Sequence, residues 1–436
     1  MNLNYSILHH SLIKETLIYT ATDMLGKAMA FILLPIVSYY MPPEDLGIAT
    51  NFTVLVQLVI LLAGMAVVNS LPYFFYEQDK NENNLLVTNL LMLCAFLCVV
   101  LTLVVALCHK LVYSYLQLNL QIQLLSVFFV LGSLISQTNL VLLRLENKAK
   151  HFAYLQVAQI VLHALIVVLF VIILKGGGVG KIYAEVLVFA LMGIIHLFVL
   201  YRKGYMKGHL EMLWVRKLLK FGIPLLPHSV SFWFKSGMDK VFITTYCGLH
   251  FNGLYSMALS VSSIFTLLVN SFFSAYTPYL QKMLSQASET ELMGIKTKIV
   301  KQTYMISVLF LVVALLALAA SWFIFVFMID IKFLPAFNYM PLIILANYAY
   351  LLYLFMIQFI YKAKKTFVMG IISFTGGLIQ MLLSYVLIRQ CGVIGAAYSF
   401  LIGNILISIG VTVYSQSIYP MPWFSYLKRR ARLQML

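Results

Sequence analysis

Long apolar segments, separated by short polar connections, follow one another along the whole chain. A helix that crosses the apolar core of a bilayer needs about 20 apolar residues. By that length the sequence predicts twelve transmembrane helices, and an even number places both termini on the same side of the membrane. The predicted spans lie near residues 15–40, 46–75, 85–108, 120–143, 153–174, 180–201, 217–246, 251–280, 302–328, 336–361, 366–389 and 392–416.

The composition narrows the class of protein to a polytopic helical membrane protein. Of the 436 residues 62% are hydrophobic and only 10% are charged, whereas a soluble domain carries roughly 25% charged residues. This excludes a soluble enzyme, a secreted disulfide scaffold and a DNA-binding domain, despite a net charge of +16. The five cysteines have neither disulfide nor metal-ligand spacing. We therefore expect no metal, no cofactor and no nucleic-acid partner.

The positions of the basic residues predict the orientation of the chain. Cytoplasmic loops of membrane proteins carry an excess of Lys and Arg. Most of the 30 Lys and Arg residues fall in connections on the same side as the N-terminus, including the 202–216 segment and the C-terminal tail. The sequence therefore predicts that both termini are cytoplasmic. The tail also carries aromatic residues beside its basic ones, which suits an anchor on anionic lipid.

Weak internal repeats indicate a duplication of six spans. Tyr40, Gly47, Pro72 and Tyr73 recur, all displaced by 206 residues, as Tyr246, Gly253, Pro278 and Tyr279. The predicted fold is all-α, with twelve transmembrane helices in two six-helix lobes related by a pseudo-two-fold axis along the membrane normal. We expect an N-terminal lobe over 1–201, a basic cytoplasmic linker over 202–216, a C-terminal lobe over 217–416 and a basic cytoplasmic tail over 417–436.

Two predicted spans carry charged residues at helical spacing. The first span holds Asp23 and Lys27, and the seventh holds Lys235 and Asp239 with Lys240 beside them. A charge at the centre of a span costs roughly 2.5–3.5 kcal/mol, so it requires a partner or water. Each i,i+4 pair is able to form an ion pair within its own helix. One interpretation is that these pairs only neutralise each other or hold the two halves together.

The functional interpretation is that the charges line a watered cavity and bind an anionic substrate. The carboxylates would then couple transport to a proton or sodium ion. The candidates for substrate binding are Lys27, Lys235, Lys240 and Arg144. The candidates for ion coupling are Asp23, Asp239, His228 and Glu185. An ordinary positive-inside anchor is the alternative for Arg144, and a packing role is the alternative for His228.

Two prolines open the seventh predicted span. Pro224 and Pro227 lack backbone donors and are surrounded by apolar residues, so they favour a helix bend of the kind found at gates. The alternative is an ordinary helix N-terminus, where proline is tolerated. Among the weaker polar positions, Gln156, Gln159 and His163 share one face of the fifth span. Interhelical hydrogen bonding is the default expectation for them.

Several motifs of the chain resemble those of bacterial polysaccharide flippases. The motifs are Gly26-Lys27, Phe31-x-x-Leu34-Pro35, the run from Tyr39 to Gly47, the run from Phe221 to His228, Asp239-Lys240, and Gly253-Leu254-Tyr255-Ser256. They are similar to the Wzx-type O-antigen flippases of the multidrug/oligosaccharidyl-lipid/polysaccharide exporter superfamily. The chain departs from that pattern because arginines are scarce in the cavity and on the outer side, where lysines stand instead.

The resemblance implies a flippase of the bacterial inner membrane rather than an enzyme. Its substrate would be an undecaprenyl-diphosphate-linked oligosaccharide, moved to the outer leaflet for O-antigen, capsule or exopolysaccharide synthesis. Alternating access would be driven by the membrane potential, by H⁺ or Na⁺ antiport, or by both. Membrane lipids are further partners, and the polysaccharide polymerase machinery is a candidate. The alternatives are a cation-coupled multidrug extruder of the same fold, a peptidoglycan-precursor flippase and an integral-membrane polysaccharide polymerase.

Overall fold

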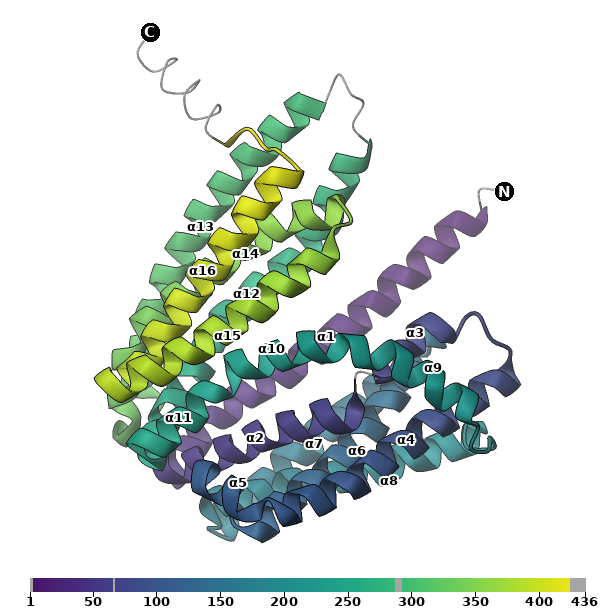
Figure 1. The fold of residues 1–436 in the computed structure, drawn as a ribbon, viewed down its shortest axis with the longest axis horizontal. Helices are drawn as coiled ribbons and strands as arrows, with labels where there is room; N and C mark the ends of the chain where they lie inside the picture. Colours follow the sequence, from purple (N-terminus) through teal and green to yellow (C-terminus); the bar gives the residue numbers. More distant parts are fainter. Residues whose placement is uncertain (1–2, 66, 287–291, 424–436) are drawn as a thin grey trace. The chain divides into compact units, whose positions relative to one another are not determined.

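The computed structural model of the chain describes residues 3–65, 67–286 and 292–423, and their regular structure is entirely helical (Figure 1). Among these described residues, eleven helices are long and apolar enough to cross a membrane. The seventh predicted span is present as a succession of shorter helices between residues 212 and 247. The prediction of an all-α membrane protein with twelve spans is therefore confirmed.

The first six spans end at the short connections that the sequence predicts, with one exception. They are α1 (Leu3–Tyr40), α2 (Pro43–Gly64), α4 (Lys80–Leu107), α6 (Leu120–Leu145), α7 (Ala149–Val168) and α8 (Gly177–Lys203). Shorter elements between them are η1 (Val67–Ser70), α3 (Leu71–Phe74), α5 (His109–Leu116) and the π-helical η2 (Leu169–Ile173). The second span was expected to continue to residue 75, which is wrong, because Met65 adopts a left-handed conformation (φ 38°) and ends α2.

The seventh span is interrupted twice. It comprises α9 (Met212–Gly222), the 3₁₀ turn η3 (Ile223–Leu225), α10 (Leu226–Ser236) and α11 (Met238–Cys247). Pro224 and Pro227 lie at the first interruption and donate no backbone hydrogen bonds there. Gly237 lies at the second. The remaining elements are α12 (Leu249–Gln286), α13 (Leu292–Phe327), η4 (Ile331–Tyr339), α14 (Met340–Lys362), α15 (Thr366–Cys391) and α16 (Ile394–Ile418).

The chain forms two compact units whose boundary lies inside the seventh span. Unit 1 comprises Met1–Trp233 with Cys247–Gly253, and unit 2 comprises Phe234–Tyr246 with Leu254–Leu436. The sequence predicts a linker over 202–216 between the two lobes, and that boundary stays a prediction. In the structure the first part of the seventh span packs on the N-terminal helices. Trp214 of α9 is fully buried, and its indole Nε1 donates to Glu82 of α4 at 3.1 Å. A Cβ on Gly222 would lie only 2.1 Å from the carbonyl oxygen of Met65.

Small residues allow a close helix contact within unit 1. Helices α6 and α8 lie side by side (Figure 1). A Cβ on Gly132 would lie 2.2 Å from the carbonyl oxygen of Phe189, and one on Gly193 would lie 2.8 Å from the Cα of Gly132. Helices in membranes pack through such small residues because they have little hydrophobic drive to associate. The packing of α6 on α8 fixes the position of α6 and of its polar side chains.

Repeat-related segments contact each other reciprocally at the start of α2 and of α12. A Cβ on Gly47 would lie 2.3 Å from the carbonyl oxygen of Leu249, and one on Gly253 would lie 1.8 Å from that of Pro43. Pro43 and Leu249 are separated by 206 residues, and so are Gly47 and Gly253. The two contacts are therefore copies of one another, as a two-fold relation between the segments requires.

The polar pairs at this contact follow the same relation in part. The ring Nδ1 of His250 lies 2.7 Å from Oε1 of Glu44, and these two positions are again separated by 206 residues. Next to them Asn252 donates to Oδ1 of Asn51 at 2.8 Å, and Asn51 donates to the carbonyl oxygen of Leu116 at 2.7 Å. The first turn of α12 is thus held on α2 by paired polar groups.

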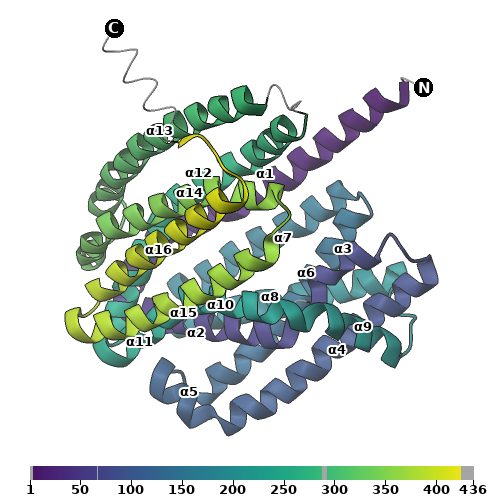
Figure 2. The ribbon, with the colours of Figure 1, turned by 45° about the horizontal axis from the view of Figure 1, so that its top comes forward.

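In unit 2 helices α14, α15 and α16 lie side by side (Figure 2). Their shared core includes Ile357, Ile360, Ile407 and Val411, all buried. Gly395 allows the turn between α15 and α16 to close, because a Cβ there would lie 2.2 Å from the carbonyl oxygen of Leu387. The layer carries Gln380 of α15 and Asn404 of α16, which contact Lys235.

Glu146 ties the connection between α6 and α7 to the end of α8. Its carboxylate accepts hydrogen bonds from Nζ of Lys203 at 2.7 Å and from the hydroxyl of Tyr205 at 2.6 Å. It also pairs with Lys148 at 3.0 Å, and only 13% of its side chain is exposed. Burial alone would raise the pKa of Glu146, but the hydrogen bonds from Lys203, Tyr205 and Lys148 outweigh it and lower that pKa.

The lowered pKa of Glu146 predicts how the stability of this connection depends on pH. The stabilisation is fully present above the unfolded-state pKa of about 4.3 and is lost as the pH falls through the lower folded-state pKa. Glu146→Gln should therefore lower the free energy of unfolding by about 1–2 kcal/mol near neutral pH. The difference from wild type should shrink in acid, as thermal melting in detergent micelles would measure.

The matched control for this prediction is Glu77→Gln. Glu77 is exposed and lies in the connection before α4, so its variant should melt like wild type at both pH values. A gap between wild type and Glu146→Gln that stays constant from neutral pH to acid would contradict the assignment of the stabilisation to an ionised carboxylate.

Candidate functional site

A polar cavity of about 360 Å³ lies within unit 1. It is bounded by η1, α6, α7 and α8. Its lining residues are Val68, Asn69, Ser133, Ser136, Gln137, Leu140, Val141, Arg144, Phe152, Gln156, Gln159 and Phe189. In α6 the spacing of Ser133, Gln137 and Arg144 follows one helix face, as does that of Phe152, Gln156 and Gln159 in α7. Two neighbouring helices thus direct polar stripes into one cavity.

Several polar atoms of this cavity have no hydrogen-bond partner among the described residues. They are Oγ of Ser136 and the amide oxygens Oε1 of Gln156 and Gln159, and each of these atoms is buried. Ser136 as a whole is only 3% exposed. A buried polar atom without a partner costs roughly 1–3 kcal/mol. The arrangement therefore offers unused hydrogen-bonding capacity to a molecule that enters the cavity.

Arg144 lies at the edge of the cavity and pairs with Asp23. Its Nη2 is 3.2 Å from Oδ2 of Asp23, and both side chains are about half exposed. The guanidinium carbon lies 4.5 Å from the ring centroid of Phe152 and 5.7 Å from that of Tyr19. Such stacking over aromatic faces adds to the ion pair and orients the guanidinium.

The i,i+4 spacing allows an ion pair between Asp23 and Lys27 within α1, but Asp23 pairs with Arg144 of α6 instead. Nη2 of Arg144 lies 3.2 Å from Oδ2 and 3.4 Å from Oδ1 of Asp23. Lys27 is exposed, and no ion pair or hydrogen bond joins it to another described residue. The roles expected for these groups in substrate binding and ion coupling stay predictions.

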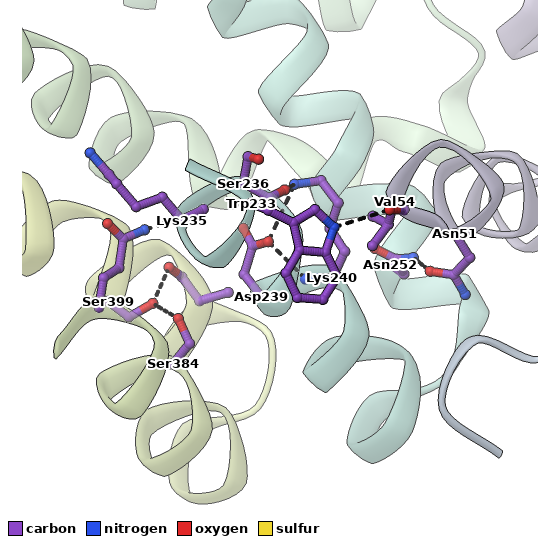
Figure 3. A network of polar contacts seen from close by, with 12 residues as sticks. Asn51, Val54, Trp233, Lys235, Ser236, Asp239, Lys240, Asn252, Ser384 and Ser399 are labelled. Atoms are coloured by element: carbon purple, nitrogen blue, oxygen red, sulfur yellow. Dashed lines mark hydrogen bonds and ion pairs between the residues drawn. The ribbon is translucent and has the colours of Figure 1, made fainter. Parts of the chain in front are cut away.

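A second polar cluster lies in unit 2 around Lys235. Nζ of Lys235 is 3.4 Å from the amide oxygen of Asn404, and Nε2 of Gln380 donates to the Lys235 carbonyl at 3.3 Å. The neighbouring hydroxyls of Ser384 and Ser399 are 2.7 Å apart (Figure 3). Asn404 and Gln380 are buried. In the described part of unit 2 no carboxylate lies within ion-pair distance of Lys235.

Asp239 pairs with its neighbour Lys240 rather than with Lys235 (Figure 3). The carboxylate accepts from the backbone N of Lys240 at 2.8 Å and lies 3.3 Å from its Nζ, which also donates to the carbonyl of Ser236. Lys235 and Asp239 do not form the pair that their spacing allows, because α10 ends at Ser236 and α11 begins at Met238. The interruption removes the i,i+4 register on which that pairing depended.

The other candidates lie apart from these two clusters. In α8 Glu185 pairs with Lys181 at 2.7 Å. In α10 His228 packs its ring edge-on against Phe232, with centroids 5.1 Å apart. Pro224 and Pro227 are exposed at the first interruption of the seventh span.

The shared face of Gln156 and Gln159 in the sequence did not by itself identify the cavity of unit 1 as a site. The available signal was the second stripe, formed by Ser133, Gln137 and Arg144 at i, i+4 and i+11. Polar stripes on consecutive spans indicate a shared polar space, because each avoids lipid. Only the packing of α6 on α7 shows that the two stripes face the same space.

The chain is similar to proteins of polysaccharide synthesis. The profile of a family described as polysaccharide biosynthesis protein matches residues 12–284. A Haemophilus influenzae protein named from the Lsg locus is 21% identical over 288 residues, covering 63% of this chain and 67% of that protein. A membrane protein of Haemophilus influenzae is 22% identical over 363 residues, covering 82% of this chain and 85% of the other.

Two solved structures share the fold at low sequence identity. An inward-facing multidrug resistance MATE family transporter of the MOP superfamily has a TM-score of 0.71 and 14% identity, covering 95% of this chain and 99% of that one. The lipid II flippase MurJ in an inward closed conformation has a TM-score of 0.71 and 13% identity, covering 93% of this chain and 87% of that one.

Proposed function

Because the chain belongs to the family of polysaccharide biosynthesis proteins, we propose that it is a lipid-linked oligosaccharide flippase. It moves undecaprenyl-diphosphate-linked sugar repeat units from the cytoplasmic to the outer leaflet, for the synthesis of O-antigen, capsule or exopolysaccharide. The fold shared with a lipid II flippase supports this proposal. So does the polytopic architecture, since such a substrate must cross a bilayer.

The observation that carries the proposal is the uncompensated charge of Lys235. An ammonium in a membrane span requires an anion, water or polar neighbours. Lys235 has neutral polar neighbours, of which Asn404 is the nearest, and no carboxylate partner within the described unit. A diphosphate supplies the missing anion, because charge-assisted hydrogen bonds to phosphate are among the stronger polar contacts. Lys240 and Arg144, whose charges are matched by Asp239 and Asp23, are secondary candidates.

The direction of transport follows from the charge of the substrate. A diphosphate with about two negative charges gains roughly 2.3 kcal/mol per charge per 100 mV on leaving a negative-inside cell. The membrane potential therefore favours outward movement, and H⁺ or Na⁺ antiport through Asp23, Asp239, His228 or Glu185 adds to it or resets the carrier. The interrupted seventh span, with Pro224 and Pro227, is the bend proposed to open and close access. Both termini lie in the cytoplasm of a bacterium, with the chain in its inner membrane.

The proposal predicts where the lipid-linked sugars accumulate in cells depleted of this protein. Undecaprenyl-diphosphate-linked oligosaccharide should collect in the inner leaflet, and re-expression of the protein should return it to the outer one. Leaflet-specific chemical labelling of the sugars measures the distribution. A normal distribution together with altered drug sensitivity would overturn the proposal in favour of a multidrug extruder.

A further inference from the structure

The cavity of unit 1 is lined by neutral polar groups of the kind that bind ligands. The roles proposed for the charged residues do not account for these groups. Its amide and hydroxyl groups come from η1, α6 and α7, namely Asn69, Ser133, Ser136, Gln137, Gln156 and Gln159. Glutamine and asparagine side chains both donate and accept hydrogen bonds, and serine does the same. The volume of about 360 Å³ is at the lower end of the range for small-molecule sites. It suits a compact polar group rather than a long lipid chain.

The electrostatics of the cavity do not favour a free anion or a cation. Arg144 is the only charged residue among those that line it, and its charge is matched by Asp23 at 3.2 Å. A diphosphate would find no unmatched cation there. A metal ion or a drug cation would meet the guanidinium and would find no lining carboxylate. The remaining ligand class is an uncharged group that is rich in hydrogen-bonding atoms.

The oxygen atoms of the cavity that lack a partner require a ligand that carries hydrogen-bond donors. Oγ of Ser136 and Oε1 of Gln156 and of Gln159 are buried without a partner in the described chain, and Ser136 is 3% exposed. The hydroxyls of a sugar ring donate and accept at once, so they satisfy amide oxygens and amide nitrogens together. Phe189, which is partly exposed, adds aromatic surface to the same lining, against which the C–H face of a ring packs.

We propose that this cavity binds an uncharged pyranose ring of the transported lipid-linked oligosaccharide. The inference rests on the proposed function and adds a sugar-reading site in unit 1, separate from the anion-binding role of Lys235 in unit 2. Gln156 and Gln159 are the residues that bind the ring hydroxyls, and Ser136 completes the set. Arg144, oriented by Asp23 and Phe152, donates at the edge of the cavity.

The test uses two probes and the purified full-length protein in lipid nanodiscs. The first probe is the undecaprenyl-diphosphate-linked sugar pool extracted from cells depleted of this protein, and the second is undecaprenyl diphosphate without sugar. The double variant Gln156→Leu/Gln159→Leu should weaken binding of the first probe by about tenfold or more. Binding of the second probe should change by less than about twofold. Thermal stability should not fall, because the variant removes two buried amide oxygens that have no partner in the described chain.

A matched control is Gln302→Leu, since Oε1 of Gln302 is also buried and unpartnered in the described chain but lies outside the cavity. This control should bind both probes like wild type. Equal weakening of both probes, no weakening, or the same loss in the control would overturn the sugar site alone. Failure of wild type to bind either probe would overturn the proposed function and the sugar site together.

Discussion

Lys235→Met is expected to reduce export of the polysaccharide at least about tenfold while the protein stays in the membrane. Methionine keeps the approximate length of the side chain but removes the charge that would bind the diphosphate. A hydrogen bond to a charged group contributes about 1.5–3 kcal/mol, and every 1.4 kcal/mol corresponds to about a factor of ten in affinity. The measurement is surface polysaccharide in a deletion strain complemented by each variant, with protein abundance in the membrane determined in parallel.

Two comparisons make the prediction for Lys235 specific. Lys332→Met is the matched control, because Lys332 pairs with Asp330 at 3.6 Å and lies outside the Lys235 cluster, so it should export normally. Lys27→Ala should also abolish export if the exposed Lys27 of α1 shares the anion-binding role. Full export by both Lys27→Ala and Lys235→Met would overturn the model of a cationic binding site.

Asp239→Ala is expected to destabilise unit 2 by about 3 kcal/mol. Asp239 is 4% exposed, and its carboxylate compensates Lys240 and accepts from the backbone at the start of α11. Removing one partner of a buried pair leaves an uncompensated charge, which costs about 3–5 kcal/mol. The lower value applies because the side chain of Lys240 is 15% exposed. A lower thermal midpoint in detergent micelles and reduced abundance in the membrane would report the loss.

The double variant Asp239→Ala/Lys240→Met tests whether the loss comes from the charge. Removing both charges should restore most of the thermal stability, since apolar replacements of a buried pair are often neutral or stabilising. Lys332→Met is the control, because the pair of Asp330 and Lys332 is more exposed and should contribute less than about 1 kcal/mol. A double variant as unstable as Asp239→Ala would assign the loss to helix capping instead.

The apolar segments were sufficient to predict the twelve-span helical fold, because a bilayer sets the length of a spanning helix. They were not sufficient to place every helix end. The end of α2 at Gly64 depends on the left-handed backbone conformation of Met65, and the packing of α9 depends on the close contact of Gly222 with Met65. The contact of Gly222 with Met65 also places α9 in unit 1. No shift in composition at 202–216 indicates this placement.

The internal repeat is weak in the sequence, but it relates two segments that contact each other in the structure. The displacement of 206 residues was based on Tyr40, Gly47 and their later counterparts. The reciprocal contacts of Gly47 with Leu249 and of Gly253 with Pro43 use that same displacement. The repeat-related segments contact each other because small residues at equivalent positions let the two backbones approach.

The sequence by itself determined that this protein is an all-helical membrane protein, which residues carry charge inside its spans, and where proline interrupts them. Only the tertiary structure decided which charges are compensated. Asp23 of α1 pairs with Arg144 of α6, and Asp239 pairs with Lys240 at a helix break. In the described part of unit 2 the ammonium of Lys235 lies near the amide oxygen of Asn404 and has no carboxylate partner. The physical reason is that hydrophobic length is a local property of the chain, whereas ion pairing and a shared cavity depend on which helix faces meet.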